Sequence, residues 1–253
     1  YSGYSILSEN GEIIHTQEIN GRLYCKVSLP PLSFTTFSKG EKLKQSANNA
    51  SGYVLENELI KYTFSNDGTL ISALDKETNN GLLDGPGNVL SLYEDRPLNW
   101  DAWDIDFYYK ESLLETAKTN KIKQVISGPV LSSLEFHYTV GNSILKQKIT
   151  LGNQSKRLDF DTYVEWKEKH KMLRVHFPTN ITSEQASFDI QYGYVKRNTH
   201  KNTSWDRAKF EVVGHKYADL SNNDNGIALL NDSKYGYSVL DNVIDLNLLR
   251  SPN

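Results

Sequence analysis

The 253-residue sequence is poor in sulfur, with Cys25 as its only cysteine and Met172 as its only methionine. A single cysteine excludes an internal disulfide framework, which small proteins of oxidising compartments commonly use for stability. The composition therefore favours a reducing compartment, and we expect a cytoplasmic protein. Cys25 itself is expected to be a small, buried apolar residue.

Long apolar runs and concentrated charge are also missing. No segment approaches the roughly 18 uninterrupted apolar residues of a membrane span, and YSGYSILSENGEIIHTQ at the N-terminus lacks the basic start and apolar core of an export signal. The formal net charge is -3, and the basic residues are spread along the chain. We predict neither a membrane nor a nucleic acid as partner. Because the sequence begins with Tyr1 instead of Met, we expect a piece of a longer protein.

Motifs of common catalytic and metal sites are absent from the sequence. The 6 histidines form no H-x-x-x-H or H-x-H spacing, and none of them begins an H-x-D pair. There is no G-x-S-x-G elbow, no P-loop and no G-x-G-x-x-G. We predict that this chain carries no catalytic residues and holds no metal ion or cofactor of its own.

The sequence is rich in rings and in short alternating runs. Its 15 Tyr, 9 Phe and 4 Trp suit half-buried sheets. Residues 12–29 alternate polar and apolar side chains around Asn20-Gly21, a pair that favours a two-residue hairpin turn. Residues 39–51 are polar and are predicted to form a connector. We place a boundary near residue 50, between a β-strand segment and linker (1–50) and a sandwich domain (51–253).

The sandwich domain is predicted to be all-β and antiparallel. A second hairpin is expected around SNDG at residues 65–68, and further runs with a period of two occupy residues 131–140, 144–151, 158–166, 172–177, 209–213, 226–230 and 243–249. In one run, Leu158, Phe160, Thr162, Val164 and Trp166 are expected to face the core, and Asp159, Asp161, Tyr163 and Glu165 the solvent. Only residues 111–121 have helical character.

Residues 93–110, YEDRPLNWDAWDIDFYYK, mix carboxylates with aromatic rings more densely than any other stretch. The carboxylates are Glu94, Asp95, Asp101, Asp104 and Asp106, and the rings are Trp100, Trp103, Phe107, Tyr108 and Tyr109. Such a mixture is typical of sugar sites, because rings cover the apolar face of a pyranose while carboxylates accept hydrogen bonds from its hydroxyls. From the residues alone, the simpler interpretation is a Trp-rich core edge with solvated acids between the rings. The aspartates lack the spacing of an EF-hand, and sequence cannot give the separation that a glycosidase carboxylate pair needs.

A second mixed stretch lies at residues 192–221, where His200, Trp205, Asp206, His215 and Asp219 stand among basic residues. This stretch is a second candidate for orienting a ligand. For each histidine, a surface or hydrogen-bonded structural role is the simpler interpretation. From the residues alone, the prediction is a β-rich protein with a possible sugar site.

Four stretches together resemble the C-terminal part of the glycoside hydrolase family 38 α-mannosidases, in their bacterial and cytosolic form. They are LENELIKYTFSNDGTLISALDKETN, NVLSLYEDRPLNWDAWDID, RNTHKNTSWDRAKFEVVGHKYADLS and GIALLNDSKYGYSVLDNVIDLNLLRSP. They cover most of the chain after residue 53, in the family's order. The preceding VSLPPLSFTTF is similar to the strand that leads into this part.

The resemblance implies a large β sandwich of the galactose-mutarotase-like type, truncated at its C-terminus. It also implies a longer enzyme whose N-terminal α/β barrel binds zinc, partly through an H-x-D motif, and supplies the carboxylate nucleophile of a retaining mechanism. We expect that barrel before Tyr1 and a shorter β segment after Asn253. The zinc would belong to the barrel and not to this chain.

The resemblance further implies which residues approach the substrate. In the family an Arg near LLRSP reaches the substrate, and Arg250 is the matching residue; WDAWDID matches a segment at the barrel interface. Trp100, Asp101, Trp103 and Asp104 are thus candidates for substrate binding or for the interface. We expect a noncatalytic domain of a cytoplasmic, bacterial α-mannosidase that hydrolyses terminal α-mannosides. Two alternatives stay open: a self-sufficient carbohydrate-binding module, and an epimerase or lyase acting on the sandwich's concave face.

Overall fold

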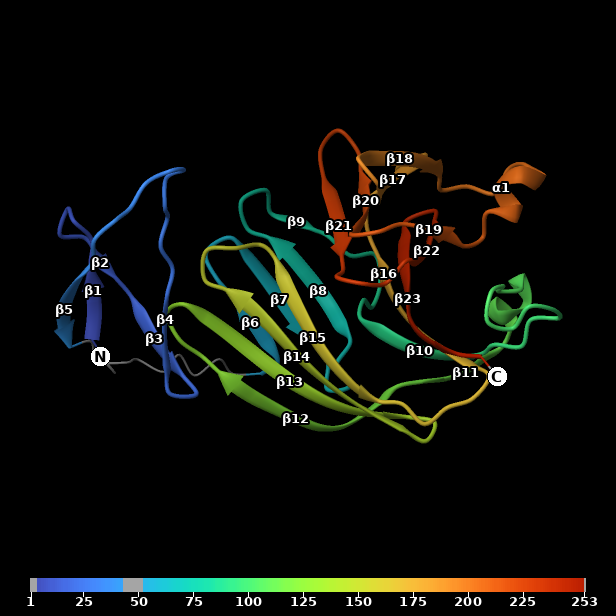
Figure 1. Ribbon diagram of the computed structural model, residues 1–253, viewed down its shortest axis with the longest axis horizontal. Helices are drawn as coiled ribbons and strands as arrows, with labels where there is room; N and C mark the ends of the chain where they lie inside the picture. The colour runs from blue at the N-terminus through green and yellow to red at the C-terminus, as the bar shows by residue number, and fades with distance from the viewer. Residues whose placement is uncertain (1–3, 43–51, 253) are drawn as a thin grey trace.

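The computed structural model describes residues 4–42 and 52–252, without the side chains of residues 124 and 125. These ranges form antiparallel sheets with two short helices, η1 (Phe107–Glu111) and α1 (Ser204–Ala208) (Figure 1). The predicted all-β antiparallel sandwich is confirmed. The predicted domain boundary near residue 50 lies outside the described residues. Neither of the two helices is long and apolar enough to cross a membrane.

Residues 4–42 form a small sheet of order β2-β1-β5 and a separate hairpin, β3-β4. The strands are β1 (Tyr4–Leu7), β2 (Ile13–Ile14), β3 (Thr16–Ile19), β4 (Arg22–Cys25) and β5 (Ser38–Lys42). The hairpin turns at Asn20 and Gly21 as predicted, with φ angles of 51° and 75°. The expected connector at residues 39–51 is wrong in its first part, because β5 pairs with β1 there. Cys25, expected to be buried, is only half-buried.

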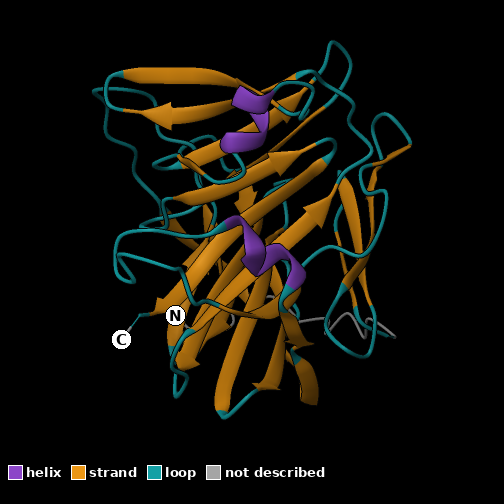
Figure 2. Ribbon diagram, turned by 90° about the vertical axis from the view of Figure 1, so that its right-hand side faces the viewer, coloured by secondary structure: helices purple, strands orange, loops and turns teal. Residues whose placement is uncertain are grey.

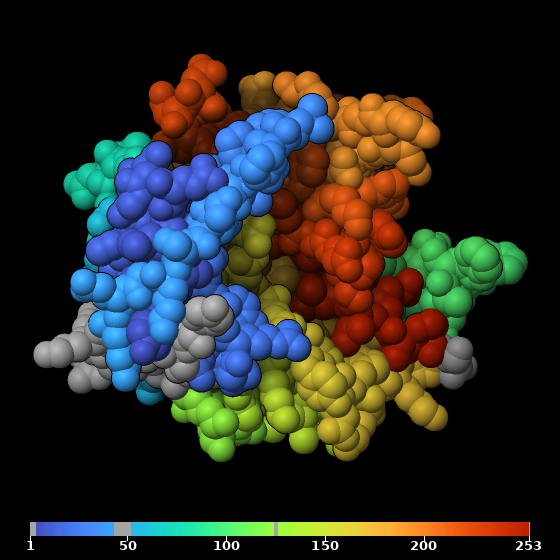
Figure 3. All heavy atoms as spheres, turned by 60° about the vertical axis from the view of Figure 1, so that its left-hand side comes forward, coloured from blue at the N-terminus to red at the C-terminus, as the bar shows by residue number. Residues whose placement is uncertain are grey.

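The buried side chain of Gln17 ties this N-terminal part to the sandwich. Its amide nitrogen donates to the carbonyl of Leu131 at 3.0 Å, and its amide oxygen accepts from the backbone N–H groups of Val130 and Leu131, both at 2.9 Å. All of its polar atoms are therefore used across the two parts. Figure 3 shows the N-terminal segment, in blue, lying along one side of the body.

Two four-stranded sheets form the first half of the sandwich. One has the order β6-β7-β8-β9 and the other β12-β13-β14-β15. Their strands are β6 (Val54–Glu56), β7 (Ile60–Phe64), β8 (Leu70–Asp75), β9 (Asn80–Gly81), β12 (Lys118–Ile126), β13 (Leu131–Val140), β14 (Ser143–Gly152) and β15 (Leu158–Glu165). The SNDG hairpin joins β7 to β8 as predicted, and residues of β15 alternate between half-buried and exposed in the predicted sense.

The second half contains a six-stranded sheet, β11-β10-β16-β23-β22-β19, and a four-stranded sheet, β18-β17-β20-β21. Their strands are β10 (Val89–Glu94), β11 (Leu113–Thr116), β16 (Lys171–Pro178), β17 (Gln185–Ile190), β18 (Gly193–Asn198), β19 (Val212–Val213), β20 (Tyr217–Ser221), β21 (Gly226–Leu230), β22 (Gly236–Leu240) and β23 (Val243–Ser251). The expected helical character of residues 111–121 is wrong. Glu111 ends η1, but residues 113–116 form β11 and residues 118–121 begin β12, because pairing with β10 and β13 outweighs a weak local helix preference.

Buried rings and aliphatic side chains connect these sheets into one core. Phe64 of β7 meets Phe136 of β13 with ring centroids 5.7 Å apart, and Phe160 of β15 meets Phe177 of β16 at 5.8 Å. Phe188 of β17 and Tyr237 of β22 close the second half at 6.0 Å. These edge-on or tilted contacts between large rings stabilise the packing of one sheet on the next.

Candidate functional site

An exposed loop at residues 95–106, which we call the tryptophan loop, connects β10 to η1. It lies at the end of the molecule that carries the C-terminus, and η1 and α1 both face the viewer in Figure 2. The green segment that contains the loop projects from the body in Figure 3. All five residues singled out from the sequence, Trp100, Asp101, Trp103, Asp104 and Arg250, meet at this loop.

Short hydrogen bonds define the shape of the tryptophan loop. The backbone N–H groups of Trp103 and Asp104 donate to the carbonyl of Trp100 at 2.7 and 2.8 Å. The Asp106 carboxylate accepts from the backbone N–H of Leu98 at 2.7 Å, which joins the two limbs of the loop. Trp100 has a φ of +58°, in the left-handed region where a bulky side chain is an outlier. Such backbone strain concentrates at binding and catalytic sites.

Arg250, near the end of β23, binds the loop through one ion pair and two hydrogen bonds to its backbone. Its Nε donates to Oδ2 of Asp95 at 2.7 Å and its Nη2 to Oδ1 at 3.1 Å, a bidentate ion pair with a carboxylate that is 1% exposed. The same Nη2 donates to the backbone carbonyls of Asp101 at 3.3 Å and Asp104 at 2.6 Å. Charge-assisted hydrogen bonds of this kind are the strong ones. Arg250 thus positions the loop, and its contact with a substrate stays a prediction.

The rings of the loop point away from the core. Trp100 is 74% exposed and Trp103 is 89% exposed, beside the exposed side chains of Leu98 and Tyr108. Large contiguous exposed apolar patches are typical of binding surfaces, so the loop is a candidate for contact with another molecule or domain. The interpretation of residues 93–110 as a buried core edge is therefore wrong for the two tryptophans.

The loop's carboxylates have separate partners. Oδ2 of Asp101 lies 3.8 Å from Nδ1 of His170, and Oδ1 of Asp104 accepts from the backbone N–H of Ile105 at 2.9 Å. Within residues 4–42 and 52–252, no group of three or more His, Cys, Asp or Glu side chains is arranged to hold a metal ion. The described residues therefore do not fit a zinc site; Asp104 and Asp106 accept hydrogen bonds from backbone N–H groups of the loop, whereas Asp101 faces His170 outside it.

A buried charged cluster under η1 was not anticipated from the sequence. Arg174 of β16 is fully buried; its Nη1 donates to Glu211 at 2.9 Å and its Nε to Asp245 at 2.6 Å. The guanidinium also lies 5.1 Å from the ring centroid of Tyr109, whose hydroxyl donates to Glu211 at 3.2 Å. Lys110 donates to Ser238 at 3.1 Å. We call Arg174, Glu211, Asp245 and Tyr109 the Arg174 cluster.

Burial and charge shift the ionisation of these groups in opposite directions. Burial raises the pKa of Glu211, an effect that Arg174 opposes. Burial also raises the pKa of the Tyr109 hydroxyl and lowers that of the Lys110 amine. For Arg174, burial opposes the charge, yet Asp245 and Glu211 raise its pKa above the ordinary value. The guanidinium is therefore permanently charged and depends on its two carboxylates.

The sequence signal for this cluster is weak. Arg174 is a polar residue inside an alternating run, where the same pattern predicts a solvent-facing side chain. Glu211 and Asp245 lie 37 and 71 residues away along the chain, and only the sheet order brings them to Arg174.

The second mixed stretch does not form one site. Nδ1 of His200 lies 3.6 Å from Asp206, and Trp205 is exposed on the same short helix. His215 instead packs edge-on against Tyr235, with ring centroids 5.6 Å apart, and Asp219 accepts hydrogen bonds from Ser221 on β20.

Comparison with known proteins finds one matching family and several similar sequences. The family described as glycosyl hydrolases family 38 C-terminal domain matches residues 55–253. Alpha-mannosidase G of Dictyostelium discoideum is 44% identical over 214 residues, which cover 81% of this chain and 20% of that protein. Alpha-mannosidase 2C1 of Mus musculus is 41% identical over 204 residues, 78% of this chain and 19% of that protein.

A solved structure has the same fold. The crystal structure of an alpha-mannosidase from Enterococcus faecalis superposes with a TM-score of 0.71 at 17% identity, covering 98% of this chain and 34% of that one. This chain thus spans about a fifth of the length of the curated relatives, at 20% and 19%.

Proposed function

Because the chain belongs to the family of glycosyl hydrolases family 38 C-terminal domains, we propose that it is the noncatalytic β sandwich of a retaining α-mannosidase that hydrolyses terminal α-mannosides. In this proposal the end of the molecule that carries the tryptophan loop packs against the enzyme's catalytic barrel. The loop forms one edge of the sugar pocket. The cytoplasmic, bacterial setting stays a prediction of the sequence.

The observation that carries the proposal is the pair of exposed rings on a loop held by Arg250. Trp100 and Trp103 expose most of their surface, and the bidentate pair with Asp95 fixes the backbone beneath them. A ring presented by a fixed backbone loses little conformational entropy when it covers the apolar face of a pyranose or the wall of a neighbouring domain. Relatives with up to 44% identity are named alpha-mannosidases, which supports a mannoside as the sugar.

The proposal assigns different roles to this chain and to the catalytic barrel. The described residues fit no zinc site, so the proposal assigns the metal to the barrel. Zinc there would supply a Lewis acid. The contribution of this chain is to position the barrel-facing loop and to exclude water from one side of the pocket.

The first test compares the isolated chain with the longer enzyme. Hydrolysis of p-nitrophenyl α-mannoside, with zinc or cobalt added, is expected from the longer enzyme and not from the isolated chain. Turnover by the purified chain above that of a heat-denatured sample would sink the proposal that the catalytic groups lie elsewhere.

The second test addresses the tryptophan loop within the longer enzyme. Trp103→Ala removes an exposed ring without touching Asp95 or Arg250, so folding should be unchanged while kcat/KM falls by about tenfold or more. The matched control is Phe34→Ala, which removes a ring that is 90% exposed in the N-terminal segment, away from the end that carries the tryptophan loop. Equal kinetics for both variants and the parent enzyme would remove the loop from the pocket and the interface.

An open groove favours a second candidate function, the self-sufficient carbohydrate-binding module. It lies on the outer face of the β18-β17-β20-β21 sheet and is lined by Ser187, Tyr194, Tyr217, Asp219, Ala228 and Leu230. Two tyrosine rings beside a carboxylate and a hydroxyl have the amphipathic character that sugars bind. Calorimetric titration of the isolated chain with mannose and mannobiose separates the two candidates, since only a self-sufficient module predicts binding without the barrel.

A further inference from the structure

The two short helices, η1 and α1, lie at the same end of the molecule as the tryptophan loop and are joined by side-chain contacts (Figure 2). The ring of Phe107 in η1 packs edge-on against Phe210, which follows α1, with ring centroids 5.6 Å apart. The amine of Lys201, which precedes α1, lies 5.6 Å from the centroid of the same Phe107 ring. The Lys110 amine donates to the backbone carbonyl of Phe210 at 3.3 Å. Because the tryptophan loop ends directly before Phe107, the loop, η1 and α1 belong to one surface.

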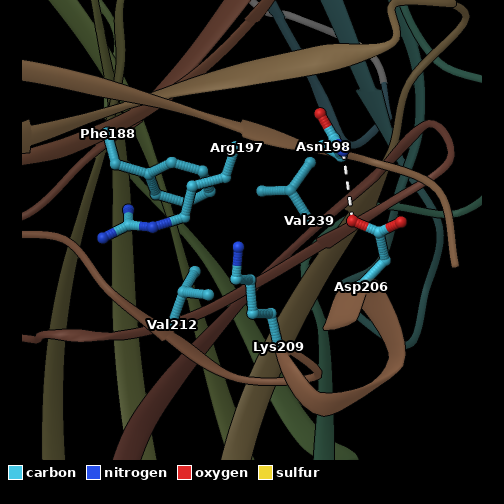
Figure 4. Close-up of a pocket in the computed structure, with 7 residues that line it drawn as sticks. All are labelled: Phe188, Arg197, Asn198, Asp206, Lys209, Val212 and Val239. Carbon is cyan, nitrogen blue, oxygen red and sulfur yellow. Dashed lines mark hydrogen bonds between the residues drawn. The ribbon is translucent and has the colours of Figure 1, made fainter. Parts of the chain in front are cut away.

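Hydrogen bonds fix the backbone of α1. The Thr203 hydroxyl accepts from the backbone N–H of Asp206 at 3.1 Å, and the Asp206 carboxylate accepts from the N–H and hydroxyl of Thr203 at 3.2 and 2.6 Å. Figure 4 shows the same carboxylate accepting from the side-chain amide of Asn198 at 3.1 Å, which ties α1 to the end of β18. A helix of five residues has little stability of its own. These bonds therefore determine where its exposed side chains are presented.

The side chains that α1 presents to solvent are those that protein interfaces favour. Trp205 is 78% exposed, and Arg207 and Lys209 are exposed beside it in the sequence. Tyr108 of η1, which is 65% exposed, adds a further ring to the same end of the molecule. Trp, Tyr and Arg carry most of the binding energy at protein–protein interfaces. The α1 segment therefore has the composition of a docking element.

The α1 segment and the tryptophan loop carry opposite charge. Residues 199–209 contain Lys201, Arg207 and Lys209 and a single carboxylate, that of Asp206, which is used by the cap of α1. The tryptophan loop contains four aspartates and one arginine, and only one of these aspartates pairs with Arg250. A partner that meets both parts needs the reverse order of charges. Such complementarity fixes the orientation in which two protein surfaces meet.

We infer that α1 is a second docking element for the catalytic barrel, in which Trp205 and Arg207 contact an acidic surface of the barrel. This surface lies beside the area that the tryptophan loop meets. The inference rests on the proposed function. This chain covers 20% and 19% of two curated relatives, so most of each relative lies outside the matched region and can supply such a surface.

Hydroxyl-radical footprinting with mass spectrometry tests this inference, because radicals oxidise aromatic rings according to their access to water. The isolated chain and the longer enzyme are oxidised side by side. The oxidation rate of Trp205 should fall by about fivefold or more in the longer enzyme, because a ring inside an interface is shielded from water. Tyr192 is the reference: it is fully exposed, lies beyond the end of β18 opposite to Asn198, and should react equally in both.

The pattern over the exposed tryptophans separates the outcomes. Protection of Trp205 together with Trp100 and Trp103 supports the inference. Protection of Trp100 and Trp103 with Trp205 still reactive would overturn it and leave the proposed function intact. Absence of protection at all three would overturn the proposed interface as well. Equal protection of Tyr192 would also count against the inference, because the shielding would then not be specific to α1.

Charge reversal tests the acidic character of the partner. Arg207→Glu in the longer enzyme should raise the oxidation rate of Trp205 by about threefold or more, since a carboxylate would then face the acidic groups of the barrel. The matched control is Arg22→Glu, which reverses an exposed arginine on β4 and should leave the rate unchanged. An unchanged rate in Arg207→Glu, or an equal rise in both variants, would overturn the acidic surface. The footprint of the unsubstituted enzyme tests the docking of α1 even where Arg207→Glu fails to fold.

Discussion

Arg174 and Arg250 lie on neighbouring strands of one sheet and hold the chain between them in different ways. Arg174 is fully buried and pairs with two carboxylates, from Glu211 and Asp245. Arg250 is 17% exposed and pairs with one carboxylate, Asp95, and with two backbone carbonyls of the tryptophan loop. Both arginines contact the segment that runs from Asp95 through η1. Arg250 pairs with Asp95 at its start, and Arg174 lies against the ring of Tyr109 in η1.

The two arginines therefore have different expected roles: Arg174 in folding stability, and Arg250 in holding a loop that recognises another molecule or domain. In the Arg174 cluster the guanidinium is fully buried and binds the chain's own carboxylates, so we expect its effect to be on stability. The Arg250 clamp uses the guanidinium to fix the backbone of the loop and leaves Trp100 and Trp103 exposed. Substitutions in the first region should therefore be costly for folding, and substitutions at the tip of the second should be costly for function alone.

Arg174→Ala is expected to have the largest effect. It leaves the half-buried Glu211 and Asp245 without the buried cation between them, and breaking an ion pair with a fully buried partner costs about 3 kcal/mol. Urea denaturation of the chain measures the loss. The control combines Arg174→Met with Glu211→Gln and Asp245→Asn, which removes all three charges at once. A smaller loss in the triple variant supports charge imbalance as the cause, whereas an equal loss would assign the effect to packing.

Arg250→Ala is expected to destabilise by about 2–3 kcal/mol, since the buried Asp95 loses its partner at a site with partial access to water. Hydrogen exchange of the backbone amides in residues 95–106 should accelerate, because the loop loses two charge-assisted hydrogen bonds. Arg250→Lys keeps the charge but not the bidentate geometry. Its stability and its exchange rates should therefore lie between those of the unsubstituted chain and those of Arg250→Ala. Unchanged exchange in the alanine variant would contradict the positioning role.

His176, which lies near the Arg174 cluster, should make the free energy of unfolding depend on pH. This change should be smaller than the loss of stability in Arg174→Ala or Arg250→Ala. Burial lowers the pKa of His176 below its ordinary value of 6.5, with Asp245 opposing the shift. The unfolded chain then binds more protons than the folded one between the lowered pKa and 6.5. Stability should therefore fall as pH drops below 6.5. His176→Gln should flatten the slope of the unfolding free energy in that window, and an unaltered slope would assign it to other groups.

The contrast between the two arginines also shows which features of the structure can be predicted from the sequence. Alternation along residues 158–166 and Asn20-Gly21 predicted strands and a turn correctly, because both signals are local. Residues 111–121 were misassigned because their partners, β10 and β13, lie elsewhere in the chain. Resemblance to a family singled out Arg250 and the loop, whereas the Arg174 cluster depends on contacts across 37 and 71 residues that no local pattern records.

Trp100→Gly is expected to have the smallest effect on folding and to test the recognition side most directly. Trp100 has a φ of +58° and a side chain that is 74% exposed. Glycine adopts this conformation without strain, at the cost of greater freedom in the unfolded chain. The two effects nearly cancel, so stability should stay equal or rise by about 0.5 kcal/mol. In the longer enzyme, kcat/KM should fall as it does for Trp103→Ala.

The matched comparison is Trp103→Ala, which removes a more exposed ring and should change stability by less than about 0.5 kcal/mol. Urea denaturation measures the free energy of unfolding of each variant, and steady-state kinetics measure its kcat/KM. A tryptophan kept in a strained conformation for recognition predicts lower activity without lower stability in both. A clear loss of stability in Trp100→Gly would instead show that the ring packs against the loop, and would move Trp100 from the recognition region to the folding region.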